Sequence, residues 1–315
     1  MRVTNNTLTN NMLRHLNAGL GRLDRYQQQL ASGKRVLKPS DDPAAVINVL
    51  ELRTSLTENN QLLKNVDTAS SWLQSIDTVL ASTTSVLHRA KELSVYAAND
   101  TLSGDDRAAI QRELEQLFDN LLQLSNSTHS GKYVFAGQKS TTVPYQRAST
   151  DPADPGYYRI AYHGGSSIQN SSELKVEIGA NSVIDINIIR TSINTDGEAE
   201  DQLFMPIFGA LSELINDLDQ GMTDKLGAEH LEALEAALDG VLATRAEVGA
   251  KLNRIELAEE RLKDLEVNFN KLLSGTQDID VAETIMMLKS EENAYRIALS
   301  VGARIIQPTL VDFLR

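Results

Sequence analysis

The sequence predicts a mainly α-helical protein, a long antiparallel helical bundle or coiled coil with a small β-rich inserted domain. Apolar residues recur at alternating spacings of three and four in five segments, which is typical of helices that pack along their length. Aromatic residues make up only 5% of the chain, and its aliphatic bulk suits helix packing better than a compact enzyme core. Strand-like patterns are confined to the middle of the chain, at residues 131–202.

The two ends of the chain, residues 1–31 and 281–315, are predicted to pair as a terminal coiled-coil assembly domain. The order of segments is palindromic, so the chain can run out and return. The stripe residues that we predict to form the assembly surface are Leu13, Leu16, Leu20, Leu23, Leu30, Val281, Ile285, Leu288, Tyr295, Leu299, Ile306 and Phe313. Gly19 and Gly21 weaken the first segment as an isolated helix. We therefore expect both ends to be largely disordered in the monomer and to become helical on polymerisation.

Two breaks in the apolar period, residues 32–42 and 274–280, are predicted to be hinge linkers. Glycine and proline interrupt the helical pattern in the first break. Asp42 suits the N-cap of the following helix and Pro43 its first position. The predicted hinge residues are Gly33, Pro39, Asp41, Asp42 and Pro43.

The middle of the chain is predicted to be a bundle domain, residues 43–130 and 203–273, that carries the β-rich insert of residues 131–202 at its distal tip. A long helix from Pro43 to about residue 98 is followed by a turn and a returning helix at about 105–128, which predicts an antiparallel hairpin. Further helices are expected at about 203–219 and 224–274. In the insert, four or more strands are expected, at residues 131–137, 157–165, 173–180 and 182–189.

Composition limits the classes of partner. The net charge of −13 argues against nucleic acid, because phosphate binding needs clustered Lys and Arg. Cysteine is absent, which excludes a disulfide scaffold, a thiol nucleophile and thiolate metal sites. No apolar run approaches the roughly 18 residues of a membrane span. The terminal stripes have few large apolar anchors for a membrane surface, and the polar N-terminus lacks the features of a cleaved signal peptide.

Side chains able to do chemistry are scattered, which predicts a protein that is not an enzyme and holds no cofactor or metal. The five histidines lie apart in sequence without a metal-ligand spacing, and we expect them at surface or boundary positions. The acid pairs Asp41–Asp42 and Asp105–Asp106 each precede a helix, where capping explains them. The alternative is an enzyme with its site in residues 131–200, but that stretch has one histidine, His163, and no recognisable constellation.

Four strings resemble the bacterial flagellin family, in order and at the family's spacing, over nearly the whole chain. They are LASGKRVLKPSDDPAA at residues 30–45, RAKELSVYAANDT at 89–101, GDDRAAIQRELEQL at 104–117 and the terminal stretch 278–315. Within the family, SGKYVFAGQKSTTVPY at residues 130–145 is similar to the hook-associated junction branch. A short flagellin, which would form the filament itself, is the alternative.

The resemblance implies a structural subunit of the bacterial flagellum that connects the hook to the filament. It implies an extracellular location at the hook–filament junction after type III export without a cleaved signal peptide. The partners implied are the other hook-associated junction protein, flagellin and copies of this chain in a helical or ring array. A cytosolic export chaperone is expected on the C-terminal helix. No nucleic acid, membrane or cofactor is expected.

Overall fold

The structure is a computed structural model, and it describes residues 5–99, 102–137, 139–149, 157–163, 174–188, 191–193, 199–220 and 229–306. The chain forms two compact units. We call Met1–Asn59 with Asp264–Arg315 the terminal unit and Asn60–Lys263 the central unit. The boundary between them falls inside two long helices, α2 (Pro43–Ala97) and α6 (Glu229–Gln277), so each of these helices contributes to both units.

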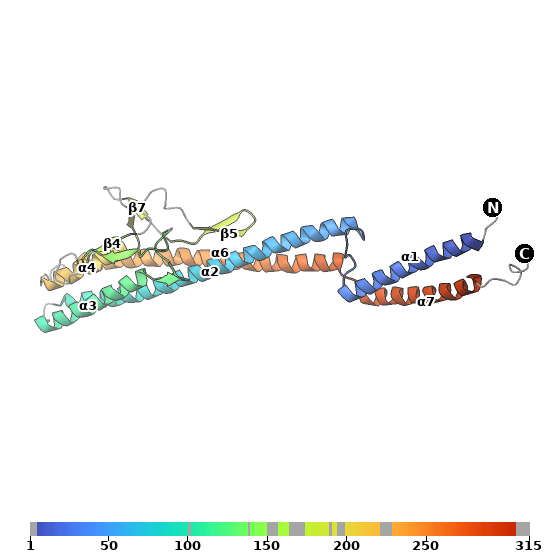
Figure 1. The fold of residues 1–315 in the computed structure, drawn as a ribbon. Coiled ribbons are helices and arrows are strands. Elements are labelled where there is room, and N and C mark those ends of the chain that lie inside the picture. The colour runs from blue at the N-terminus through green and yellow to red at the C-terminus, as the bar shows by residue number, and fades with distance from the viewer. Residues whose placement is uncertain are drawn as a thin grey trace, which may run out of the picture. The chain divides into compact units, whose positions relative to one another are not determined.

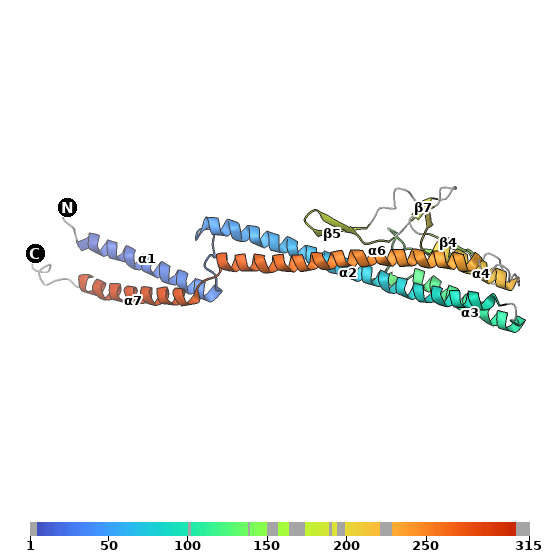
Figure 2. The same cartoon turned by 180° about the vertical axis from the view of Figure 1, so that it is seen from behind.

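The terminal unit contains the predicted pairing of the two chain ends. Helix α1 (Asn5–Ser32) lies beside α7 (Val281–Ile306) in both views (Figures 1 and 2). The two helices are antiparallel, because Arg22 bonds to Glu291 while Gly302, further along α7, lies against Met12, earlier in α1. The mainly helical fold with paired terminal helices is therefore confirmed.

The helices end close to the predicted breaks but not at the same residues. Gly33 ends α1 with a φ of +70°, a left-handed conformation that glycine adopts without a steric penalty. Helix α6 continues to Gln277, so residues 274–277, which we expected in the second break, are helical. Gly275 accounts for the difference, because a single glycine inside a helix costs only about 1 kcal/mol and does not by itself end it.

The central unit is a helical bundle built from parts of α2 and α6 together with α3 (Gly104–Ser125) and α4 (Met205–Asp219). Its largest fully buried side chains include those of Leu80, Leu114, Phe118 and Phe208. Ion pairs join neighbouring helices at their surfaces: Arg89 with Glu113 at 2.6 Å, Lys91 with Glu235 at 2.6 Å, and Arg245 with Asp77 at 3.1 Å. The predicted α-helical hairpin of α2 and α3 is present.

The strands of the insert form four separate two-stranded antiparallel sheets, each made by strands that are consecutive in sequence. They are β1 (Thr128–His129) with β2 (Lys132–Tyr133), β3 (Tyr145–Arg147) with β4 (Ile160–Tyr162), β5 (Lys175–Gly179) with β6 (Ser182–Asp185), and β7 (Thr191–Ile193) with β8 (Ala199–Asp201). Each predicted strand region contains one observed strand, but the observed strands are shorter. β1 lies at the end of the stretch predicted as helix, because α3 ends at Ser125.

An aromatic cluster ties the insert to the bundle. Tyr145 is buried, with its ring 5.5 Å from that of Phe204 and 5.9 Å from that of Phe208. Its hydroxyl donates to Asp201 Oδ2 at 2.6 Å, and the amides of Leu203 and Phe204 donate to the same carboxylate at 3.1 and 2.7 Å. Burial raises the pKa of Asp201, and these hydrogen bonds oppose that rise. Asp201 therefore orders the start of α4, where Phe204 offers no side-chain cap.

Candidate assembly interface

Helices α1 and α7 meet along a seam with the alternating spacing of a coiled coil. The buried and half-buried residues that form it on α1 are Met12, Leu16, Gly19, Leu23, Tyr26 and Leu30. Those on α7 are Thr284, Leu288, Glu291, Tyr295, Ala298 and Gly302. Each set advances by steps of four and three, so one narrow face of each helix is used.

Two glycines in the seam lie opposite large side chains and set the register of the pair. A Cβ placed on Gly19 would lie 3.5 Å from Cδ2 of Tyr295, and one placed on Gly302 would lie 2.1 Å from Cε of Met12. Arg22 reinforces the same register, because its Nε and Nη2 donate to the two carboxylate oxygens of Glu291 at 2.5 and 3.3 Å.

The structure divides the predicted stripe residues into two groups. Leu16, Leu23, Leu30, Leu288 and Tyr295 lie in the seam. The others whose side chains are described point outward and are exposed: Leu13 at 51%, Leu20 at 47%, Val281 at 55%, Ile285 at 44% and Leu299 at 45%. Phe313 and the side chain of Ile306 lie outside the described part of the structure.

Sequence reasoning missed several seam residues. Met12, Gly19 and Tyr26 satisfy a heptad as well as the chosen stripe does, but two of these three positions are not aliphatic. The available signal was Gly19, because a glycine at heptad spacing permits close approach of an aromatic ring on a partner helix. On α7, the small residues Ala298 and Gly302 gave the same signal.

Helix α7 presents apolar side chains on nearly every side. Beyond those already named, Met286 is 66% exposed, Met287 46%, Ile297 63% and Val301 48%. A helix that is apolar all round is normally buried in a larger structure. Helix α7 has only α1 beside it in the terminal unit, so most of this surface is uncovered.

The described part of the terminal unit has almost no apolar core of its own. Val36, Ala45 and Val49 are its only buried apolar side chains, and all three lie outside α1 and α7. The central unit contains every other buried apolar residue of the described chain. Large exposed apolar side chains show the opposite distribution, since most of them belong to the terminal unit. The terminal pair therefore lacks the burial that stabilises a helix within a single chain.

A hydrogen-bonded crossover replaces the loose linkers that two chain breaks suggest. The amide of Arg35 donates to the carbonyl of Gln277 at 2.6 Å, and that of Ile279 donates to the carbonyl of Gly33 at 3.1 Å. Between them, Lys34 and Asp278 form an antiparallel bridge. The buried side chain of Gln29 also donates to the Arg35 carbonyl, at 2.9 Å.

The predicted capping roles of the acidic residues are confirmed. Asp42 Oδ1 accepts from the amide of Ala45 at 3.1 Å, which caps α2 with Pro43 as its first residue. Asp41 Oδ2 accepts from the amides of Lys38 and Leu37 at 3.0 and 3.2 Å. These backbone hydrogen bonds, with that from Lys38 the largest cause, hold the pKa of Asp41 below its usual value.

Asp106 completes a capping box with Ser103 at the start of α3. Pro39 is exposed and lies in the turn that precedes α2. The acid pairs of the chain therefore act on helix starts, which leaves the hinge role of residues 32–42 and 274–280 as a proposal.

Substituting Gly33 should weaken the crossover. Gly33→Ala forces alanine into a left-handed conformation, and we expect a loss of about 1–2 kcal/mol in local stability. The amides of Arg35 and Ile279 should then exchange with solvent several-fold faster in hydrogen-exchange measurements. Gly275→Ala is the matched control, because Gly275 is helical with open space around its Cα, so alanine there should slow exchange instead. Equal effects of the two substitutions would contradict this account of the crossover.

Other parts of the described structure were searched for chemistry. No group of three or more potential metal ligands occurs among the residues that the structure describes. Within those same residues, no helix is long and apolar enough to cross a membrane. His230 is an exception to the expected surface position, because it is 3% exposed and its Nε2 lies 2.8 Å from Asp217 Oδ2. It therefore joins α6 to α4.

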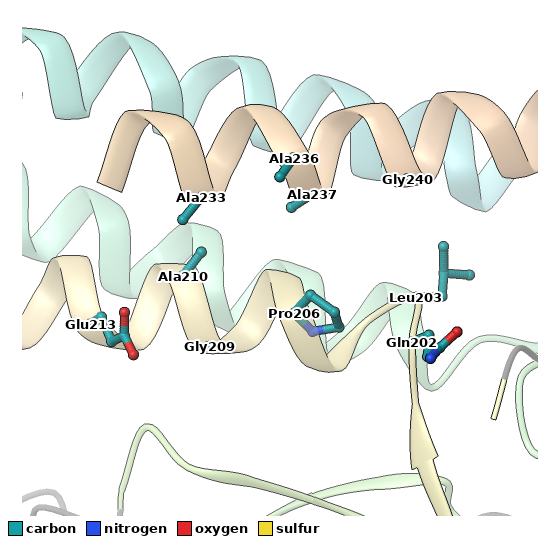
Figure 3. A pocket seen from close by; sticks show the side chains of 10 residues that line it. All are labelled: Gln202, Leu203, Pro206, Gly209, Ala210, Glu213, Ala233, Ala236, Ala237 and Gly240. Atoms are coloured by element: carbon teal, nitrogen blue, oxygen red, sulfur yellow. The ribbon is translucent and has the colours of Figure 1, made fainter. Parts of the chain in front are cut away.

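A groove of about 420 Å³ lies between α4 and α6 in the central unit (Figure 3). Small residues line both sides: Gly209 and Ala210 on α4, and Ala233 and Ala237 on α6. Glu213 is the one ionisable side chain in this lining, so the groove lacks the paired groups that acid–base catalysis uses.

The fold and the exposed seam-flanking residues together define a class of structural protein whose terminal helices are completed by neighbouring subunits. Comparison with known families agrees. The bacterial flagellin N-terminal helical region matches residues 3–140, and the bacterial flagellin C-terminal helical region matches residues 231–314. The chain belongs to the bacterial flagellin family.

Relatives within the family have two kinds of name. The chain is 30% identical to flagellar hook-associated protein 3 of Escherichia coli (strain K12), over 86% of each chain. It is 26% identical to a flagellin of Bacillus subtilis (strain 168), over 90% of this chain and 89% of the flagellin. A solved flagellar hook-associated protein from Vibrio parahaemolyticus has the same fold, with a TM-score of 0.63 and 20% identity over 76% of this chain and 100% of that one.

Proposed function

We propose that the chain is a structural subunit of the bacterial flagellum that connects the hook to the filament. The higher identity to hook-associated protein 3 than to flagellin supports this branch of the family. The observation that carries the proposal is the terminal pair, in which apolar side chains on both helices lie uncovered and the unit has almost no core. Subunits with this surface gain stability by packing against one another.

Polymerisation would order the terminal pair. Each half-exposed aliphatic side chain contributes about 1 kcal/mol when a neighbour covers it, whereas an isolated helix of this length is marginal in water. Gly19 and Gly21 lower the intrinsic stability of α1 further. Export in an unfolded state and assembly only at the growing structure would both follow, because the ends become rigid only among neighbours.

The remaining partners belong to the same proposal. The subunit would lie between the other hook-associated junction protein and flagellin, outside the cell, after export without a cleaved signal peptide. Before export, a cytosolic chaperone would cover α7, whose exposed Met286, Ile297 and Val301 need protection from aggregation. The crossover at residues 32–42 and 278–280 would supply adjustment between a flexible hook and a stiffer filament.

Gene deletion tests the proposal. A strain without the chain should grow hooks without filaments and release flagellin into the medium, and expression of the intact chain should restore the filaments. Normal filaments in the deletion strain would contradict the proposal.

A short flagellin is the second candidate, because the Bacillus subtilis flagellin aligns along most of both chains. Immunogold electron microscopy with an antibody against this chain separates the two. A junction subunit should be labelled at one place, between the hook and the filament. A flagellin would be labelled along the whole filament.

A further inference from the structure

The exposed apolar side chains of the terminal pair form two separate rows. Row A consists of Leu13 and Leu20 on α1 with Val281, Ile285 and Leu299 on α7. Row B consists of Met286, Met287, Ile297 and Val301, all on α7. The ion pair between Lys289 and Glu292, at 2.8 Å, interrupts row A near its middle.

The positions of these residues relative to the seam place the rows on opposite sides of the pair. Leu13 and Leu20 each follow a seam residue of α1 by one position, and Ile285 and Leu299 do the same on α7. In an antiparallel pair of right-handed helices, residues that follow the seam on both helices lie on one side. Row A therefore spans both helices.

Row B lies on the other side because its members precede the seam. Met287, Ile297 and Val301 come one position before Leu288, Ala298 and Gly302. On this side α1 contributes Arg22 and Arg25, which border a hollow of about 330 Å³ near the crossover. Row B is therefore an apolar strip confined to α7, with a charged border on α1.

Symmetry decides how two such rows can be covered by copies of one chain. If row A packed on row A, a two-fold dimer would close and row B would stay exposed. If row A packs on row B of the next copy, every subunit uses both rows and the contact repeats. The second arrangement alone covers all nine side chains.

The size of the contact explains why a pair of subunits is not the stable unit. Nine side chains, each about half exposed, bury on the order of 500 Å², well below the roughly 1,200 Å² at which stable complexes begin. A subunit held on both sides doubles that area. Association should therefore be cooperative.

Resting on the proposed function, we propose that row A of one copy packs against row B of the next copy, so that terminal pairs associate head to tail. Row A is continuous with the α1–α7 seam, and both rows belong to the same helix pair. A second copy of this chain can therefore supply the complementary surface without another protein. Leu20 in one subunit then lies close to Ile297 in its neighbour.

Cysteine cross-linking in isolated flagella tests this contact, and the absence of native cysteine makes the result specific. Cells that lack the native chain would express Leu20→Cys, Ile297→Cys or both variants together, and a short bismaleimide would be added to the flagella. We expect a dimer of this chain only when both variants are present. Asn10→Cys, exposed on the side of α1 away from α7, is the matched control and should give no dimer with Ile297→Cys.

The outcomes separate this inference from the proposed function. Dimers from Leu20→Cys alone, products that join either variant to a different flagellar protein, or no cross-link in flagella that contain the chain would each overturn the head-to-tail contact. Absence of the intact chain from flagella would instead overturn the proposed function, and the inference with it.

Discussion

Replacing Leu20 and Leu299 together with aspartate should abolish incorporation of the chain into flagella while leaving its thermal unfolding unchanged. Both side chains are already about half exposed, so charges there should alter the stability of the isolated subunit by no more than about 0.5 kcal/mol each. In the assembly the same positions are covered, and an unpaired buried carboxylate costs several kcal/mol. Quantitative blotting of isolated flagella measures the loss, which we expect to exceed tenfold.

The control for this double variant is Asn10→Asp, which adds a charge to the outer side of α1. Asn10 is exposed and belongs to neither row, so near-normal incorporation is expected. If Leu20→Asp/Leu299→Asp is incorporated as well as Asn10→Asp, row A is not an assembly surface. A lowered unfolding temperature of the purified double variant would show that these residues act within the subunit instead.

Replacing Asp201 with alanine should produce the largest loss of stability in the central unit. The hydroxyl of Tyr145 and the amides of Leu203 and Phe204 would all lose their acceptor inside the protein. Each unsatisfied buried donor costs about 1–3 kcal/mol, so we expect at least about 3 kcal/mol. For a unit of this size, thermal unfolding should shift down by roughly 6–12 °C, as followed by circular dichroism.

Tyr145→Phe is the comparison for that variant. It keeps the buried ring and leaves both backbone amides bonded to Asp201, so the expected loss is only about 1 kcal/mol. If the two substitutions destabilise the chain equally, the carboxylate does not organise the start of α4. Neither substitution changes the exposed rows, so incorporation at low temperature should persist for both.

The helical architecture could be predicted because its signals are local and repeated. Heptad spacing identified the helices, and Asp42 and Pro43 identified the start of α2. The choice of seam could not be made in the same way, because residues 12, 19 and 26 fit a heptad as well as residues 13, 20 and 27 do. Only the partner helix decides between them, through the fit of Tyr295 against Gly19 and of Met12 against Gly302.

Long-range polar contacts were also beyond the sequence. Nothing near Asp201 in the chain points to Tyr145, and nothing near His230 points to burial beside Asp217. The pairing of strands only with their sequence neighbours was likewise not predicted. Each of these features depends on which segments meet in space, whereas helix starts and amphipathic stripes depend on residues within a few positions of one another.

Hydrogen exchange of the full-length chain, compared between the free monomer and isolated flagella, tests the central claim most directly. The claim is that α1 and α7 depend on neighbouring subunits for their stability. Amides of both helices should exchange rapidly in the monomer and slowly in flagella, while amides around Leu80 and Phe118 in the central unit should be protected in both. Protection of α1 and α7 in the monomer equal to that of the central core would contradict the account.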